Sequence, residues 1–389
     1  MSTQKKTINF LQEFSIPLIL GVLIALVWAN LAPENYHHFV HNEIIGHISL
    51  HFFVNDIFMV FFFAMAAIEI TQSLLPGGSL NPLKRAINPL MATLGGVLGP
   101  ALVFLGLNAL IGSPEFARGW GIPTATDIAL AWLVARVVFG AQHAAVSFLL
   151  LLAIVDDGIG LMIIAFFYPD PANPVAPLWL LLTVAGMLVA YLLRRKNVQS
   201  YWPYIILGGI LSWAGLYLAH IHPALALVFI VPFLPHPPRE EFGLFEDDPQ
   251  DHSTLKTFEH EWKIFVDFGL LLFGLTNAGV EFSEINTLTW LVLIALVGGK
   301  TIGIFLMGSL ATVIGFPFPK GMGYKELLVA GVIAAMGLTV ALFVSGVAFI
   351  DPGLQGAAKM GALFSAVAAV IAFALGKVLG IKKVKDTQA

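Results

Sequence analysis

Long apolar runs separated by short polar segments make up most of the chain. One crossing of a bilayer by a helix takes about 20 apolar residues. On that scale the pattern predicts about twelve membrane-spanning helices and an all-α polytopic membrane protein. The segments are 15–32, 52–75, 86–112, 119–139, 144–168, 175–193, 202–220, 221–234, 262–283, 289–312, 326–350 and 356–380. The eighth is short, and its boundary with the seventh falls at the sequence HIHP.

The composition agrees with this interpretation. Apolar residues make up 58% of the 389 positions and charged residues only 11%, far from the quarter that is typical of soluble domains. The chain has no cysteine, which excludes disulfides and thiolate metal sites, and a net charge of −4 gives no reason to expect a nucleic-acid partner. The first apolar run has no clear cleavage site after it, so we expect an uncleaved first helix.

The positive charges fall on one side of the predicted membrane. Under twelve spans, the side opposite the N-terminus keeps only Arg118 and Lys359. Because Lys and Arg accumulate in cytoplasmic loops, both termini are predicted to be cytoplasmic. The clusters on the N-terminal side are Lys5/Lys6, Lys84/Arg85, Arg194/Arg195/Lys196, Arg239 with Lys256 and Lys263, Lys320/Lys325, and Lys382/Lys383/Lys385.

Two polar loops stand out between the apolar segments. Residues 235–260 form an acidic cytoplasmic loop with three histidines. It is either a solvated connector or a surface that responds to pH, because histidine changes charge near neutrality. The external loop 33–51 contains IIGHISLH, whose partial alternation predicts a short hairpin.

Four ionisable residues lie deep in the predicted membrane: Asp127, Asp156, Asp157 and Lys300. A charge at the centre of a membrane helix costs roughly 2.5–3.5 kcal/mol on insertion scales. Such side chains must face a cavity, bind a cation or hold protons. Each option indicates movement of ions or protons. A buried ion-pair network that only holds helices together would explain one aspartate and the lysine, but it leaves two carboxylates without a role.

The segment around Asp127 is predicted to be a broken helix. In GIPTATDIALAW, Pro123 removes a backbone donor and two threonines supply hydroxyl oxygens, so helical continuity is interrupted just before the carboxylate. AGVIAAMGLTVALF, with Gly331 and Gly337, is a second candidate. Each is second in its group of three helices, 86–168 and 289–380, and this position suggests two three-helix repeats.

Lys300 needs a carboxylate partner at its depth, which leaves the other carboxylates to share protons or to hold a monovalent cation. Carboxylate and threonine oxygens are the ligands that hard cations prefer. Coupled carboxylates of this kind meet the requirement for a site at which Na⁺ and H⁺ compete.

At this point the motifs resemble a known family. ATDIALA around Asp127, LAIVDDGIG around Asp156 and Asp157, LTNAGV at 275–280 and the GK of Lys300 are similar to those of the NhaA Na⁺/H⁺ antiporters, in order and over essentially the full chain. The resemblance implies an NhaA fold with inverted three-helix repeats and two broken, crossing helices. It implies electrogenic export of Na⁺ or Li⁺ in exchange for protons by alternating access, with no cofactor, in sodium and pH homeostasis at a bacterial inner membrane.

The resemblance also assigns roles to single residues. It implies that Asp127 with Thr126 belongs to the broken-helix site, that Asp157 is the favoured ligand for the cation and the proton, and that Asp156 pairs with Lys300. Na⁺ is then expected at Asp127 and Asp157.

The resemblance further suggests residues that respond to pH and a division of the chain into two parts. His222, Glu259 and Glu69 match family positions linked to pH response, although a polar helix end explains His222 equally well. We expect a transport core at approximately 86–168 and 289–380, an interface part at approximately 1–85 and 175–283, and a homodimer through the external loop 43–53.

The chain departs from the family after Glu69. Many members carry Lys-Arg-Glu close behind this glutamate, whereas here Thr71, Gln72 and Ser73 follow Ile70. Without these charges, the second helix is not expected to supply a steep pH switch.

Buried aspartates also occur in two other classes of membrane protein. A related secondary transporter for another solute, such as an organic anion, is disfavoured by three aspartates. An intramembrane aspartyl protease would need its aspartates on two helices with a GxGD-type turn, and this motif is absent from the sequence. The sequence leaves open the preference among Na⁺, Li⁺ and K⁺.

Overall fold

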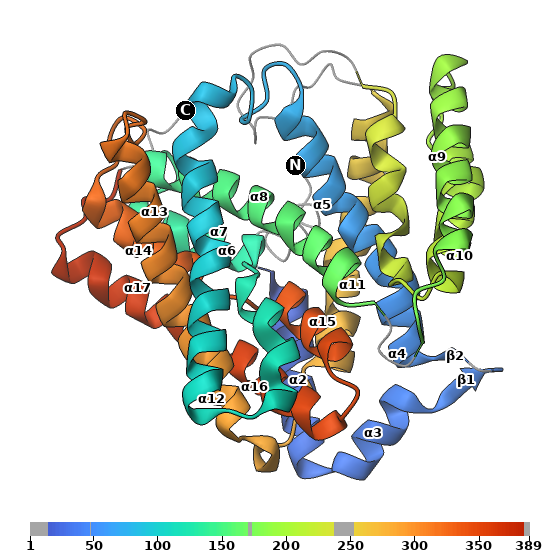
Figure 1. Cartoon of the computed structure of the whole chain (residues 1–389), viewed down its shortest axis with the longest axis horizontal. Coiled ribbons are helices and arrows are strands. Elements are labelled where there is room, and N and C mark those ends of the chain that lie inside the picture. The colour runs from blue at the N-terminus through green and yellow to red at the C-terminus, as the bar shows by residue number, and fades with distance from the viewer. Residues whose placement is uncertain (1–14, 47, 170–172, 237–252, 385–389) are drawn as a thin grey trace, which may run out of the picture.

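The computed structural model describes residues 15–46, 48–169, 173–236 and 253–384, and most of them are helical (Figure 1). The first half of the chain contains the elements α2 (Ile16–Leu31), α3 (Pro33–His41), β1 (Glu43–Ile45), β2 (Ile48–Ser49), α4 (Leu50–Phe52), η1 (Phe53–Phe58), α5 (Met59–Leu74), α6 (Leu83–Ile111), η2 (Pro114–Thr124), α7 (Ile128–Phe139), α8 (Ala144–Phe167), η3 (Pro177–Trp179) and α9 (Leu180–Arg195).

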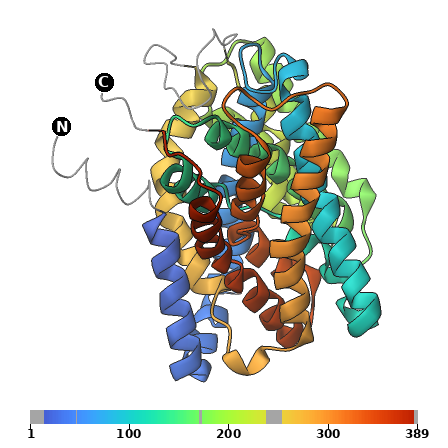
Figure 2. The ribbon, with the colours of Figure 1, turned by 90° about the vertical axis from the view of Figure 1, so that its left-hand side faces the viewer.

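The second half of the chain continues with short and long helices in alternation. Its elements are η4 (Tyr204–Gly209), α10 (Ile210–Leu218), η5 (Pro223–Phe229), η6 (Val231–Phe233), α11 (Thr254–Asn277), η7 (Phe282–Glu284), α12 (Thr287–Ile294), η8 (Ala295–Lys300), α13 (Thr301–Val313), α14 (Tyr324–Ala334), α15 (Thr339–Ala348), α16 (Pro352–Phe364) and α17 (Val367–Val378). At right angles to Figure 1, many of the long helices run close to one common direction, as expected for helices that cross a bilayer (Figure 2).

Within the described residues, six continuous helices are long and apolar enough to cross a membrane, or up to eight if each of two bent pairs is one span. Three further apolar helices are shorter: 16–31, 204–218 and 223–233. Each predicted apolar segment coincides with one of these helices or with α11. The structure therefore agrees with a multi-pass membrane protein, while the count of twelve spans stays a prediction.

The two bent pairs lie where the sequence predicts broken helices. The pair η2 and α7 bends by 54° and the pair α14 and α15 by 50°. Asp127 follows the first half of its pair and caps the N-terminus of α7. Gly337 lies in the second break, where a Cβ would press against the carbonyl of Ala125. A glycine is therefore needed for the close approach of the two breaks.

Two loop predictions need correction. The external loop 33–51 forms the predicted hairpin, with Glu43 opposite Ser49, but the hairpin follows a helix, α3, that the alternation did not reveal. The sequence predicts a polar loop at 235–260, but α11 begins at Thr254, where the side chain of Ser253 accepts a hydrogen bond from the backbone N–H of Lys256. Glu259 is therefore helical. Residues 237–252 of that loop lie outside the described residues.

Close packing of α6 against α13 sets the position of Lys300. A Cβ on Gly95 or Gly99 would clash with the backbone of Gly303 or Gly299 on the facing helix, so only glycine permits this approach. A Cβ on Gly96 would lie 3.7 Å from Cε of Lys300, which shows that the lysine stem runs along α6. The preceding turn, η8, is a π-helix, a feature often found at functional sites.

The helices fall into groups around α5 and α8, which contact each other near the centre of Figure 1. The helices α9 and α10 pack together at the right of this view, whereas α13, α14 and α17 lie at the left. The hairpin of β1 and β2 projects at the lower right, beyond α3.

Candidate functional site

The two broken helices meet at their breaks. The backbone N–H of Asp127 donates a hydrogen bond of 2.8 Å to the carbonyl of Met336, and Oγ1 of Thr126 donates one of 2.8 Å to the carbonyl of Ala334. These bonds satisfy backbone groups that a break in a helix leaves without partners. The structure therefore brings together two segments that the sequence analysis linked only by their position in the chain.

Asp127 is held by both broken helices at once. Its Oδ1 accepts a hydrogen bond of 3.0 Å from the backbone of Leu130, on α7. Its Oδ2 accepts one of 3.2 Å from the backbone N–H of Thr339 and a short one from the hydroxyl of Thr339, on α15. These three hydrogen bonds and the positive N-termini of α7 and α15 stabilise a negative charge on this carboxylate, which is 3% exposed.

Asp156 forms a buried ion pair with Lys300. Nζ of Lys300 lies 2.7 Å from Oδ2 of Asp156, and both side chains are fully buried. The same Nζ donates a short hydrogen bond to the carbonyl of Thr124, in the broken segment before Asp127. Oδ1 of Asp156 has no hydrogen-bond partner among the described residues. The predicted lysine–carboxylate pair is therefore present, and it is tied to the first break.

Asp157 is the aspartate whose charge the described structure compensates least. Its side chain is 9% exposed, and its Oδ1 has no hydrogen-bond partner among the described residues. The carboxylates of Asp156, Asp127 and Glu69 all lie close enough to repel a charge on Asp157, and Lys300 is the nearby cation. Since Lys300 is already paired with Asp156, a charge on Asp157 calls for a cation or a proton.

The carboxylates around Asp157 offer oxygen ligands for a cation. The described residues hold no cluster of three or more His, Cys, Asp or Glu side chains arranged as a metal site. The neighbours of Asp157 are instead the carboxylates of Asp156, Asp127 and Glu69, whose oxygens suit a hard cation. A weakly held, partly hydrated ion is what a transporter must bind and release.

Two of the predicted pH-response residues lie together, between α5 and α11. Glu69 lies close enough to Glu259, Lys263 and Asp267 for their charges to interact. Nε2 of Gln72 donates a hydrogen bond of 2.8 Å to Oε2 of Glu259. Glu69 also acts on the charge of Asp157, so it lies between this cluster and the aspartates.

His222 lies at a different place. Its Nδ1 accepts a hydrogen bond of 3.3 Å from the backbone of Ala224 and so caps η5. Its ring lies 4.7 Å, centroid to centroid, from the ring of Phe343 on α15. The capping role that the sequence allowed is present, and the histidine also contacts a broken helix.

Thr339 is the site residue that sequence reasoning missed. It follows the break at Gly337 much as Thr126 follows the proline of the first break. This position of a threonine beside an interrupted helix is the signal that could have revealed it. The sequence does not reveal that Thr339 bonds to Asp127, because the two residues are 212 positions apart.

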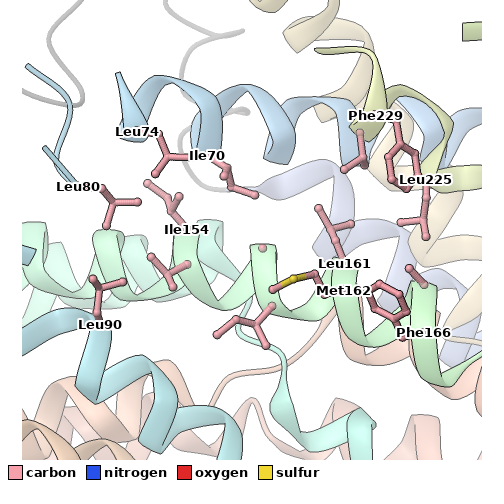
Figure 3. Close-up of a pocket in the computed structure, with 15 residues that line it drawn as sticks. Ile70, Leu74, Leu80, Leu90, Ile154, Leu161, Met162, Phe166, Leu225 and Phe229 are labelled. Carbon is pink, nitrogen blue, oxygen red and sulfur yellow. The ribbon is translucent and has the colours of Figure 1, made fainter. Parts of the chain in front are cut away.

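An apolar cavity lies near this region, lined by residues of α5, α8 and η5. It has a volume of about 400 Å³ and is lined only by apolar side chains and a glycine, so it supplies no ligand for an ion. Figure 3 shows Ile154, Leu161 and Met162 facing Ile70 and Leu74 across it.

The comparisons agree with the motifs and the geometry. The family described as Na⁺/H⁺ antiporter 1 matches residues 6–378. The "Na(+)/H(+) antiporter NhaA" of Geobacter sulfurreducens is 64% identical over 380 residues, which cover 98% of this chain and 100% of that protein. The protein of the same name from Jannaschia sp. is 45% identical over 418 aligned positions, covering 96% and 98% of the two chains.

A solved structure is similar in fold. The sodium proton antiporter MjNhaP1 from Methanocaldococcus jannaschii, at pH 8, superposes with a TM-score of 0.53 at 16% identity, over 94% of this chain and 91% of that one. At this identity the likeness concerns the fold alone. The sequence matches, by contrast, are close and span nearly the full length, and the chain therefore belongs to the NhaA family of Na⁺/H⁺ antiporters.

Proposed function

We propose that this chain exports cytoplasmic Na⁺ or Li⁺ in exchange for external protons, electrogenically, with Asp157 as the central ligand of both. Na⁺/H⁺ exchange itself follows from membership in the family. The protein is accordingly a transporter and not an enzyme, and it needs no cofactor, because the ions are its substrates.

The observation that carries the proposed site is the uncompensated charge of Asp157. Asp127 has donors from two helix N-termini, and Asp156 has Lys300, but Oδ1 of Asp157 lacks a partner among the described residues. A proton or a Na⁺ ion bound there removes the same repulsion from neighbouring carboxylates. One site that takes either ion, but not both at once, is sufficient for exchange.

The other two aspartates then have supporting roles. Asp127 and Thr126 hold the crossing of the broken helices beside the site and supply oxygens for the cation. Lys300 neutralises the charge of Asp156. Asp156 therefore does not compete with Asp157 for the transported proton. Since these groups are coupled, the loss of a proton from Asp157 and the binding of Na⁺ form one linked step.

The fold proposed for this function has twelve spans and two inverted three-helix repeats, 86–168 and 289–380. The crossing of the two bent pairs, each second in its group, supports the repeats. These repeats would form the transport core, and residues 1–85 and 175–283 the interface part. The apolar cavity between α5 and α8 lies between these two parts. In alternating access the core moves relative to the interface part, and an apolar boundary lets it move without breaking polar contacts.

The proposed setting is a bacterial inner membrane, with both termini in the cytoplasm and the lipid bilayer around the helices. A homodimer through the loop 43–53 is supported by the hairpin of β1 and β2, which has only two strands and so leaves outer edges for pairing. Transport of an unrelated solute and intramembrane proteolysis are not favoured, because the family consists of cation antiporters.

Exchange measured in proteoliposomes tests this proposal directly. Purified protein should acidify or alkalinise the vesicle interior when Na⁺ or Li⁺ is supplied, and the response should exceed that to K⁺. A membrane potential should change the rate, because the exchange is electrogenic. Equal, small responses to all three cations would contradict the proposal.

Replacing Thr339 with valine should weaken both the crossing and the site. Thr339→Val removes the hydroxyl that donates to Asp127 and leaves a buried acceptor with one donor fewer, at a cost of about 1–3 kcal/mol. We expect a lower melting temperature in detergent and a lower apparent affinity for Na⁺. Thr339→Ser keeps the hydroxyl and is the matched control. Equal behaviour of the two variants would show that this hydrogen bond does not matter.

The dependence on pH should follow from competition at the aspartates. With Thr71, Gln72 and Ser73 in place of charges, apparent Na⁺ affinity should fall smoothly as pH falls, because protons occupy the cation site. Transport measured against pH at several Na⁺ concentrations tests this. Saturating Na⁺ should restore activity at low pH. An abrupt onset that Na⁺ does not restore would instead implicate a sensor at Glu69, Glu259 or His222.

A further inference from the structure

Three histidine rings form a row that links two elements of the predicted external side. On α3, the rings of His37 and His41 lie 4.5 Å apart, centroid to centroid. The ring of His41 lies 5.0 Å from that of His51, on α4. The angle between the ring planes is 33° in the first pair and 30° in the second. The row is therefore continuous across the hairpin that separates the two helices in sequence.

The row runs from the surface toward a buried layer. His37 and His41 are exposed, and His51 is half-buried. The charges that act on His51 come from His41, Lys359 and His222. Lys359 is buried on α16.

His222, which interacts electrostatically with the inner histidine of the row, contacts a broken helix. His222 packs on Phe343, which lies four residues, about one helical turn, beyond Thr339 on α15. Thr339 in turn donates to Asp127. His222, whose charge acts on His51, thus packs against the helix that contributes Thr339 to the proposed cation site.

We propose that His37, His41 and His51 form the external proton-entry path of the exchanger, which takes protons from bulk water and delivers them to the layer of His222 and Lys359. This inference rests on the proposed function and orientation, and it names the side-chain route by which protons enter.

The chemistry of imidazole suits such a path. A ring accepts a proton at one nitrogen, releases another from the second nitrogen and is neutral again, so each transfer is balanced. Centroid separations of 4.5 and 5.0 Å bring the nitrogens of adjacent rings within reach of one bridging water. His41 is exposed at the surface but only partly surrounded by solvent; this partial burial, together with His37 and Lys359, lowers its pKa to about 4, so that the ring passes a proton on and does not keep it.

The charges around the row favour the passage of one proton at a time. Lys359 and the neighbouring rings oppose a second positive charge, while Glu284 on η7 partly offsets Lys359. Further titratable groups on the elements that carry or adjoin the row are Glu34 and His38 on α3, Glu43 on β1 and Asp56 on η1. Glu284 is itself half-buried, and burial together with Glu281 raises the pKa of its carboxyl group.

The test compares three single variants in right-side-out membrane vesicles loaded with Na⁺. His41→Gln and His51→Gln interrupt the row, whereas His38→Gln removes an exposed histidine of the same helix that lies outside it. Proton uptake is followed with an entrapped dye, at alkaline external pH and low buffer concentration, where the supply of protons limits the rate. His41 is exposed, so its replacement is not expected to disturb folding.

We expect His41→Gln and His51→Gln to slow proton uptake several-fold, with the rate restored by adding free imidazole outside. The loss should disappear at acidic external pH, and His38→Gln should behave as the parent protein. The path is overturned if proton uptake is unchanged in both row variants. It is also overturned if imidazole does not restore the lost rate, or if the loss depends on internal instead of external pH. Absence of exchange in the parent protein would instead contradict the proposed function.

Discussion

Asp157→Asn protein is expected to fold normally and to show no Na⁺/H⁺ exchange above the background of empty liposomes. The amide keeps the size of the side chain but cannot carry the negative charge that attracts Na⁺, nor can it take up and release a proton near neutral pH. Because Oδ1 of Asp157 has no hydrogen-bond partner among the described residues, the substitution breaks no described hydrogen bond of that atom. Removing a buried charge without a dedicated counter-ion should leave the melting temperature unchanged or raise it.

Asp127→Asn should also abolish exchange, but with a measurable loss of stability. Asp127 uses both of its oxygens, toward Leu130 and toward Thr339, and an amide supplies only one acceptor. The matched control is Asp351→Asn, which changes an exposed aspartate that caps α16 through Leu354. Purified, reconstituted Asp157→Asn protein that transports at the parental rate would exclude the proposed mechanism, whatever the result at Asp127.

Lys300→Ala should destabilise the protein by about 3–5 kcal/mol, because it leaves Asp156 buried without its counter-ion. The lysine also donates to the carbonyl of Thr124, so the broken segment before Asp127 loses a donor as well. Thermal unfolding in detergent should show the loss as a lower melting temperature. Lys325→Ala, which changes an exposed lysine, provides a control for the loss of one positive charge.

A double substitution measures the interaction between Asp156 and Lys300 apart from the contribution that each side chain makes alone. Replacing Asp156 with asparagine and Lys300 with methionine removes both charges, and the protein should recover much of the stability that Lys300→Ala loses. If the double variant also transports, it should carry fewer protons per cation. Losses for Asp156 and Lys300 that simply add up would argue against a coupled pair.

The local properties of the fold could be predicted from the sequence because they depend on neighbouring residues. The apolar runs marked the helices, and Pro123 with Asp127 marked the first break, since proline and an N-cap act on the backbone within a turn. The cost of a charge at membrane depth singled out Asp156, Asp157 and Lys300 without knowledge of their partners.

Helices that depend on tertiary packing were not visible in the same way. Residues 254–261 are too polar to count as a span, yet they extend α11, where the ring of Phe258 lies 5.3 Å, centroid to centroid, from the ring of Tyr201. The helix α3 is short and polar, and Tyr36 anchors it by donating a hydrogen bond of 2.7 Å to the carbonyl of Leu275. Both helices depend on partners that are distant in the chain or exist only once the fold has formed.

The sequence by itself thus determined where the membrane segments lie and which few ionisable side chains lie at membrane depth. Only the tertiary structure decided how those side chains are paired: Lys300 with Asp156, 144 residues away, and Asp127 with Thr339, 212 residues away. The physical reason is that hydrophobic periodicity and helix breaks are local, whereas the choice of one carboxylate among three depends on how distant helices pack. The glycine contacts between α6 and α13 position Lys300 for Asp156, and Oδ1 of Asp157 is left without a hydrogen-bond partner among the described residues.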